Sequence, residues 1–288
     1  MNENLKQSTA KRILLFLIIL FVSGLIGTAI STLFMIAGNV GMKIAQGISS
    51  VMMFVVPPIV YYYITRKEHQ MQDMGFRAVN RPWWLYILIG VALMFVSLPV
   101  TNQLSAWNES ISLGGMFEQF GDLMSSLEER AAEVTEQMLT VDTFGGLLFN
   151  LLIIALIPAV GEELTFRGVL QQSLTRGLKN PHVAIILSAA IFSFIHFQFL
   201  GFFPRMFLGI LLGYMFYVSG SLWTSIVMHF VNNGTAVVVF YLNHKGIINV
   251  DVDHFGSMSL AMVAVSAVVT IGLIMVCWKN AFGWSCKS

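Results

Sequence analysis

The stretch that decides the fold runs from Phe144 to Val169 and reads FGGLLFNLLIIALIPAVGEELTFRGV. Its first part, up to Val160, is an apolar run close to the roughly 20 residues that a transmembrane helix needs. Its last part adds two adjacent glutamates and an arginine, where each charge is costly. Ionisable side chains inside a membrane span mark a functional site by default. The stretch therefore predicts a membrane helix that carries a polar site.

The rest of the chain has the same character. Of its 288 residues, 56% are hydrophobic and only 11% are charged, whereas a soluble domain carries about a quarter charged residues. This composition predicts an all-α, polytopic integral membrane protein. The sequence contains eight candidate transmembrane helices, at about 13–36, 46–65, 83–104, 144–178, 182–199, 205–219, 222–243 and 258–278.

We expect three parts along the chain: an N-terminal part (1–143) with three spans and an extracytoplasmic insert, a catalytic core (144–243), and a C-terminal part (244–288) with an outer loop and the last span. Twelve of the sixteen Lys and Arg residues fall in segments on the side of the N-terminus. Cytoplasmic loops carry the positive excess, so both termini are expected in the cytoplasm. The four remaining basic residues are assigned to outer segments: Lys43, Arg130, Arg205 and Lys245.

The insert between about residues 103 and 143 is acidic. Apolar residues recur in it at helical spacing from Phe117 to Met138, and acidic residues fill the other face. This pattern predicts an amphipathic helix that lies on the membrane, caps the bundle or packs on the rest of the protein.

Several classes of protein are excluded. There is no basic, aromatic-interleaved patch for nucleic acid, and two cysteines near the C-terminus indicate neither a structural zinc site nor a disulfide scaffold. The chain also lacks a His-Glu-x-x-His motif, a Gly-x-Ser-x-Gly motif and any Asp within a span. The usual zinc-protease helix, the serine hydrolase elbow and an aspartyl dyad are therefore absent.

The first polar cluster is Glu162, Glu163 and Arg167. Glu163 and Arg167 are four residues apart and share a helix face, so they can form a buried ion pair. Glu162 points away from that pair and is left for chemistry. The alternative is that all three charges merely end the span near the membrane interface.

Two further clusters lie on later spans. FSFIHF places Phe192 four residues before His196, and HFVNN places His229 four residues before Asn233. Asn232 is turned away from that second pair by about 100°. Taken alone, each cluster has a structural alternative, because polar side chains also join membrane helices.

Depth in the membrane brings these clusters together. Glu163 lies 17 residues before Asn180, in the basic turn, and His196 lies 15 residues after Pro181. At 1.5 Å per residue, both are roughly 22–26 Å from that turn, so they can meet. Pro158 is expected to break the helix just before the glutamates and to open a cavity there.

A Glu, two His and an Asn that converge have two chemical interpretations. Glu and His can deprotonate a water molecule and protonate a leaving amine, while His and Asn donate to an oxyanion. Equally, the Glu and both His residues can hold a catalytic zinc ion with one open position.

The three motifs, EELTFR, FSFIH and HFVNN, resemble in order and spacing those of the CPBP (CAAX protease and bacteriocin-processing) intramembrane proteases, also called the Abi family. This family includes the type II CAAX prenyl endopeptidases. The resemblance covers about residues 144–243. It implies a bundle of eight helices that encloses a conical polar cavity.

The resemblance also implies a role for each matching residue. Glu162 is the expected catalytic glutamate, His196 helps to activate the water, and His229 and Asn233 form the oxyanion site. If the enzyme is a metalloprotease, zinc is bound by Glu162, His196 and His229. The supporting residues are expected to be Glu163, Arg167 and Phe192.

These observations predict an intramembrane endopeptidase that cleaves a membrane-associated protein or peptide, with the lipid bilayer as its surroundings and no nucleic acid as partner. We expect it in a bacterial plasma membrane. Two alternatives from other classes are a non-catalytic bacteriocin-immunity or scaffold protein and a transporter that uses the same polar residues as a proton relay.

Overall fold

The computed structural model describes residues 3–65, 74–76, 83–111, 118–249 and 259–282, and every regular element in these ranges is a helix. Here α denotes an α-helix, η1 a 3₁₀-helix and the other η elements π-helices. The elements in chain order are α1 (Glu3–Thr32), η1 (Met35–Ala37), α2 (Gly38–Ser50), η2 (Val51–Val55), α3 (Val56–Thr65), α4 (Trp83–Val96), α5 (Leu98–Glu109), α6 (Glu118–Leu139), α7 (Phe144–Asn150), η5 (Leu151–Leu156), α8 (Ile157–Glu163), η6 (Leu164–Gln171), α9 (Gln172–Leu178), α10 (Pro181–Phe194), α11 (Phe202–Ser219), α12 (Leu222–His244) and α13 (Leu260–Phe282).

Within the described residues, six helices are long and apolar enough to cross a membrane, and a seventh span is formed if the bent pair α4–α5 is counted as one. The α10 helix is apolar but has only 14 residues. At 1.5 Å per residue it measures about 21 Å, which is short of a hydrocarbon core of about 30 Å. The all-helical membrane fold agrees with the prediction, but eight full spans are not confirmed.

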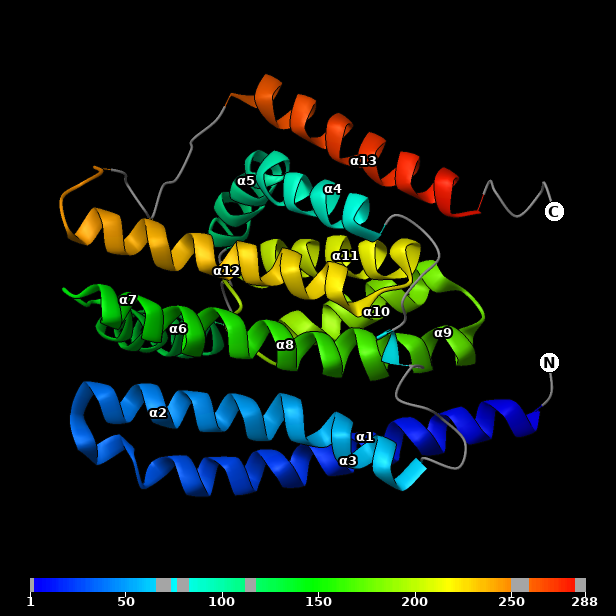
Figure 1. Cartoon of the computed structure of the whole chain (residues 1–288), viewed down its shortest axis with the longest axis horizontal. Helices are drawn as coiled ribbons and strands as arrows, with labels where there is room; N and C mark the ends of the chain where they lie inside the picture. The colour runs from blue at the N-terminus through cyan, green and yellow to red at the C-terminus, as the bar shows by residue number, and fades with distance from the viewer. Residues whose placement is uncertain (1–2, 66–73, 77–82, 112–117, 250–258, 283–288) are drawn as a thin grey trace.

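The helices that carry the sequence motifs lie in the middle of the molecule (Figure 1). The continuous segment from α7 to α9 packs with α10, α11 and α12; helices α1 to α3 cover one side, and α4, α5 and α13 cover the other. Large apolar side chains on the two outermost helices are exposed, among them Phe21 on α1 at 64% and Val268 on α13 at 70%. Such surfaces suit lipid rather than water.

The third predicted span is bent by 44° at the break between α4 and α5. Pro99, in the first turn of α5, has no N–H and cannot continue the backbone ladder. The hydroxyl of Ser266 on α13 donates to the carbonyl of Val96 at 2.6 Å, so this backbone oxygen at the bend has a partner. Proline therefore bends this span, and a neighbouring helix satisfies a polar group at the bend.

Pro158 does not break its helix, contrary to the expectation from the sequence. The chain stays helical from Phe144 to Leu178, and Pro158 is buried near the start of α8. The preceding segment η5 and the following segment η6 are π-helical. Wider π turns absorb irregularities within a helix and often occur at functional sites. A cavity is present, but a helix break does not create it.

The hairpin of α10 and α11 stops short of the end of its long neighbours. Its turn is held from outside by α5, where Asn108 donates to the carbonyl of Phe199 and accepts from the N–H of Phe203, both at 2.8 Å. On α6, Glu128 accepts from the N–H of Leu200 at 3.0 Å. The predicted insert thus contains a helix that contacts this turn.

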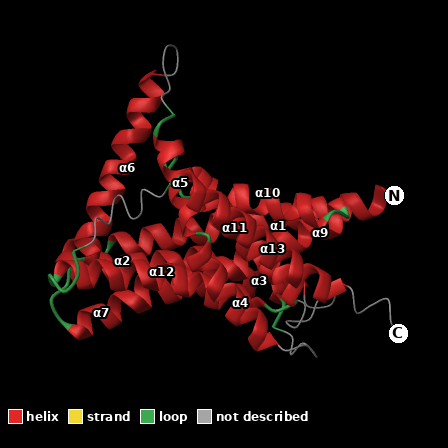
Figure 2. Ribbon diagram, turned by 90° about the horizontal axis from the view of Figure 1, so that it is seen from above, coloured by secondary structure: helices red, strands yellow, loops and turns green. Residues whose placement is uncertain are grey.

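Figure 2 shows α6 running along the outside of the bundle between the end of α5 and the start of α7. Of its predicted apolar face, Met138 is buried, Leu127 and Val134 are exposed, and Phe117 lies outside the described residues. One end of the bundle contains the start of α1, the end of α13 and the turn between α9 and α10 (Figure 1).

Candidate active site

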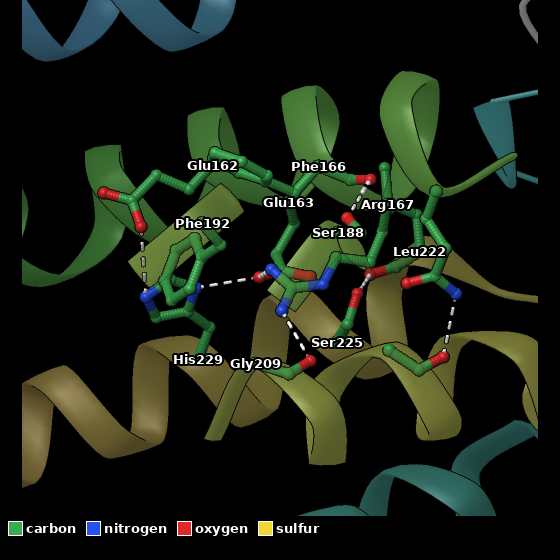
Figure 3. Close-up of polar contacts among 12 residues, drawn as sticks. Glu162, Glu163, Phe166, Arg167, Ser188, Phe192, Gly209, Leu222, Ser225 and His229 are labelled. Atoms are coloured by element: carbon green, nitrogen blue, oxygen red, sulfur yellow. Dashed lines mark hydrogen bonds and ion pairs between the residues drawn. The ribbon is translucent and has the colours of Figure 1, made fainter. Parts of the chain in front are cut away.

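The ion pair suggested by the four-residue spacing is present in the core. Glu163 and Arg167 are fully buried, with relative exposures of 0% and 1%, and their Oε1 and Nη1 atoms are 2.6 Å apart (Figure 3). Arg167 also donates through Nη2 to the carbonyl of Gly209 on α11 at 2.9 Å. Its guanidinium carbon lies 5.1 Å from the centre of the Phe192 ring on α10. Arg167 thereby links three helices.

One turn further along, Gln171 repeats the contact with α11. Its Nε2 donates to the carbonyl of Gly213 at 3.0 Å. A Cβ atom on Gly213 would lie 2.8 Å from the Gln171 Oε1 atom and 2.9 Å from a methyl group of Ile185. The helices approach this closely because position 213 has no side chain.

His229 stands between the two glutamates (Figure 3). Its Nδ1 is 2.9 Å from Oε1 of Glu163, and its Nε2 is 3.7 Å from Oε2 of Glu162. Since Glu163 is ionised by its pairing with Arg167, it only accepts hydrogen bonds, and Nδ1 of His229 carries the hydrogen. Glu163 therefore fixes the ring and directs Nε2 towards Glu162.

The side chain of Glu162 has different contacts from that of Glu163. It is 7% exposed, and no Lys or Arg nitrogen within the described ranges lies within 4.0 Å of its carboxylate. The Nε2 atom of His229 lies 3.7 Å from Oε2 of this carboxylate. The helix thus presents one carboxylate to a structural pair and the other to the space between the helices.

His196 enters the site from the turn after α10. Its Nδ1 is 2.8 Å from the backbone carbonyl of Phe192, one of the carbonyls left without a helical partner where α10 ends. A carbonyl only accepts, so Nδ1 carries the hydrogen and Nε2 of the neutral ring has a free lone pair. The Phe192 ring packs edge-on against both His196 and His229, with centroid separations of 5.0 and 6.0 Å. Phe192 therefore separates and orients the two imidazoles.

These side chains meet at a cavity of about 290 Å³. The structure brings together all four residues that the sequence assigned to catalysis, while the Glu163–Arg167 pair lies behind them. The conical shape expected for the cavity is not confirmed. The lining residues are Met94, Glu162, Phe192, His196, Gly201, Pro204, Arg205, Leu208, Leu212, His229, Asn232 and Asn233.

The sequence interpretation missed two polar residues of this cavity. Asn232 was expected to face away, but it lines the cavity, and its Nδ2 donates to Oδ1 of Asn233 at 3.2 Å. The cavity wall covers enough of the α12 surface to include both of the adjacent positions 232 and 233. Arg205 was assigned to an outer segment; it lies in the first turn of α11 and also lines the cavity. The signal in the sequence was the single Arg at the start of an apolar run.

A catalytic zinc ion needs three protein ligands and one open position. In the part of the chain that the structure describes, no group of three or more His, Cys, Asp or Glu side chains is arranged to hold a metal. Glu162 and His229 are near each other, but His196 does not join them in a group of three within the described residues. The residues in this arrangement do not fit a zinc site.

Comparison with known proteins gives one match. Residues 144–235 match a family model described as type II CAAX prenyl endopeptidase Rce1-like. The comparisons with curated proteins and with solved structures each found no match. The resemblance to CPBP and CAAX proteases is therefore confirmed over the segment that contains all three motifs and the four residues that the sequence predicted to be catalytic. Over these residues the chain is similar to a CAAX-type protease, and the described residues around them include several apolar helices long enough to cross a membrane.

Proposed function

We propose that this protein is an intramembrane endopeptidase that hydrolyses a peptide bond of a membrane-associated protein or peptide, with a water molecule activated by Glu162 and His196. The observation that carries the proposal is the different environment of two adjacent glutamates. Glu163 is held by Arg167, whereas Glu162 faces a cavity that both histidines line and has no Lys or Arg partner among the described residues. A carboxylate without a structural partner is available as a base.

The proposed reaction uses the side chains as follows. Glu162 accepts a proton from water while the water oxygen forms a bond to the carbonyl carbon, and Nε2 of His196 helps to hold that water. The carbonyl oxygen becomes an oxyanion. The C–N bond then breaks, and the proton is passed to the leaving nitrogen, which gives an acid and an amine. One water molecule is consumed for each bond cleaved.

Asn233 and His229 are the proposed donors to the oxyanion. Since Oδ1 of Asn233 accepts from Asn232, the Nδ2 group of Asn233 is left to donate to substrate. His229 uses Nδ1 on Glu163, so it donates from Nε2 when the ring carries two protons. Both side chains line the same cavity as Glu162, which supports this assignment.

We propose a bacterial plasma membrane as the location, with both termini in the cytoplasm. Two observations support the orientation. The sequence assigns twelve of the sixteen Lys and Arg residues to segments on the side of the N-terminus, and the start of α1 and the end of α13 lie at the same end of the bundle (Figure 1).

The test is a cleavage assay with purified protein in liposomes, using a library of apolar peptides and mass spectrometry. Glu162→Gln keeps the size of the side chain but removes the base, so cleavage is expected to fall by about 100-fold or more. Glu136→Gln, on the exposed surface of α6, is the matched control and should cleave like wild type. Equal cleavage by wild type and Glu162→Gln would contradict the proposal.

The same liposomes separate the alternatives. A scaffold or immunity protein would cleave no peptide in any form, and a transporter would change the internal pH. Zinc catalysis predicts that a chelator abolishes cleavage and that added zinc restores it; the water mechanism proposed above predicts no effect of the chelator.

A further inference from the structure

One cation in the catalytic cavity has no part in the proposed reaction. Arg205 is half-buried in the first turn of α11 and lines the same cavity as Glu162 and His196. Gln198, two positions after His196, holds its guanidinium in place through two hydrogen bonds. Nη1 donates to the carbonyl of Gln198 at 3.2 Å, and Nη2 donates to the Oε1 atom of Gln198 at 2.7 Å. Both acceptors are neutral, so the tether positions the charge without neutralising it.

The charge of Arg205 is not balanced by direct contact with a carboxylate. Glu128 and Glu162 attract the guanidinium through space, but across the described ranges no carboxylate oxygen lies within 4.0 Å of it. Arg167, the other arginine near the cavity, has Glu163 at 2.6 Å. A cation withdrawn from water without a counter-ion is costly, and such a group in a cavity is ready to bind an anion.

The surroundings of Arg205 favour an anion as well. The cavity wall includes the start of α11, where the helix dipole is positive. The backbone donors there are used or missing, because the N–H of Phe203 bonds to Asn108 and Pro204 has none. A guanidinium has five N–H donors, and the tether uses two of them. The arginine side chain is therefore the donor that is left for a ligand.

We propose that Arg205 binds a carboxylate of the substrate, and that this contact selects where the chain is cut. The carboxylate is either the C-terminal group or an Asp or Glu side chain, since both offer the same two-oxygen acceptor to a guanidinium. The inference rests on the proposed peptidase function. Because Arg205 and Glu162 line one cavity of about 290 Å³, the bound carboxylate and the cleaved bond belong to the same short stretch of substrate.

Three forms of one fluorescent, N-acetylated apolar hexapeptide test the proposal: the free C-terminal acid, the C-terminal amide, and the amide with one internal Glu. Cleavage in liposomes is measured for wild type and for Arg205→Gln. Binding is measured separately with the Glu162→Gln protein, so that recognition is observed without turnover. We expect wild type to prefer one carboxylate-bearing form over the plain amide by about 10- to 100-fold, the range of a charge-assisted hydrogen-bond pair.

Arg205→Gln is expected to reduce that preference to about one. Gln198→Ala removes only the side-chain part of the tether and should weaken the preference partly, through KM rather than kcat. The matched control is Arg176→Gln at the exposed end of α9, which should keep the full preference. A preference for the free acid assigns the C-terminus, and a preference for the internal Glu assigns a side chain.

Three results separate this inference from the proposed function. Equal cleavage and equal binding of all three peptides overturn the carboxylate site and leave the peptidase intact. An equal loss in Arg205→Gln for acid and amide peptides also overturns it, since Arg205 would then serve the reaction itself. If no peptide is cleaved but the Glu162→Gln protein binds a carboxylate form more tightly, the carboxylate site stands and the peptidase proposal fails.

Discussion

At the scale of single residues, Glu162 and Glu163 show how adjacent side chains acquire different surroundings. Successive residues on a helix are turned by about 100°, so the two carboxylates face different neighbours. Glu163 meets Arg167 and Nδ1 of His229, both through the same oxygen, Oε1. Glu162 meets the cavity. One carboxylate is fixed by a cation and orients a histidine, and the other is left to act on a ligand.

Arg167→Met is expected to destabilise the protein by about 3 kcal/mol or more, because it leaves Glu163 charged and buried without its cation. The double variant Glu163→Gln/Arg167→Met removes both charges and should recover part of that loss. Thermal unfolding in detergent measures both. If the double variant is less stable than Arg167→Met, the pair does not act as a charge pair in this core.

At the scale of helices, the site depends on the close contact between η6 and α11. Arg167 and Gln171 each donate to a backbone carbonyl of α11, at Gly209 and Gly213. Both acceptors are glycines, and Gly209 also lies close to α10, where its Cβ would be 3.0 Å from the Cβ of Ala189. Small residues at this contact let side chains reach backbone groups that are usually covered.

Gly213→Ala should therefore separate these helices and break the bond from Gln171, with a loss of about 1–3 kcal/mol from overpacking. Gly272→Ala on α13 is the control, because a Cβ there meets nothing within 4 Å. The control is expected to be neutral or slightly stabilising, since Ala forms helix better than Gly. Equal melting temperatures for the two variants would show that the close approach at Gly213 is not required.

The turn between α10 and α11 is the second element on which the site depends. Asn108 holds it with two hydrogen bonds of 2.8 Å, one at Phe199 and one at Phe203. Asn108→Ala should speed hydrogen exchange at residues 197–203 while the helices stay protected. Cleavage should fall by up to about 100-fold, because His196 precedes this turn and small displacements of the proposed catalytic groups are costly. Unchanged exchange in this segment would count against the role of Asn108.

At the scale of the whole molecule, the orientation in the membrane can be measured directly. In a protein with Cys277→Ala and Cys286→Ala, Lys245→Cys lies just after α12 and Leu178→Cys lies at the end of α9. A membrane-impermeant maleimide added to intact cells should label the first variant and not the second. The reverse pattern would place both termini outside the cell.

Much of this protein follows from the sequence alone, because the signals involved are local. Apolar runs locate the membrane helices, since only a helix satisfies its own backbone in lipid. A spacing of four residues predicted the pair of Glu163 and Arg167, and distance from a turn predicted that Glu163, next to Glu162, lies at a depth similar to that of His196. Each of these inferences depends on geometry within one helix or hairpin.

Only the tertiary structure decided the rest. It placed Asn232 and Arg205 in the cavity, kept the helix continuous through Pro158, and put His229 between the two glutamates. These features depend on where a helix ends and on which surfaces of the surrounding helices line the cavity. Both are set by contacts between segments that are distant in the chain, such as the hold of Asn108 on the α10–α11 turn, so local spacing does not contain them.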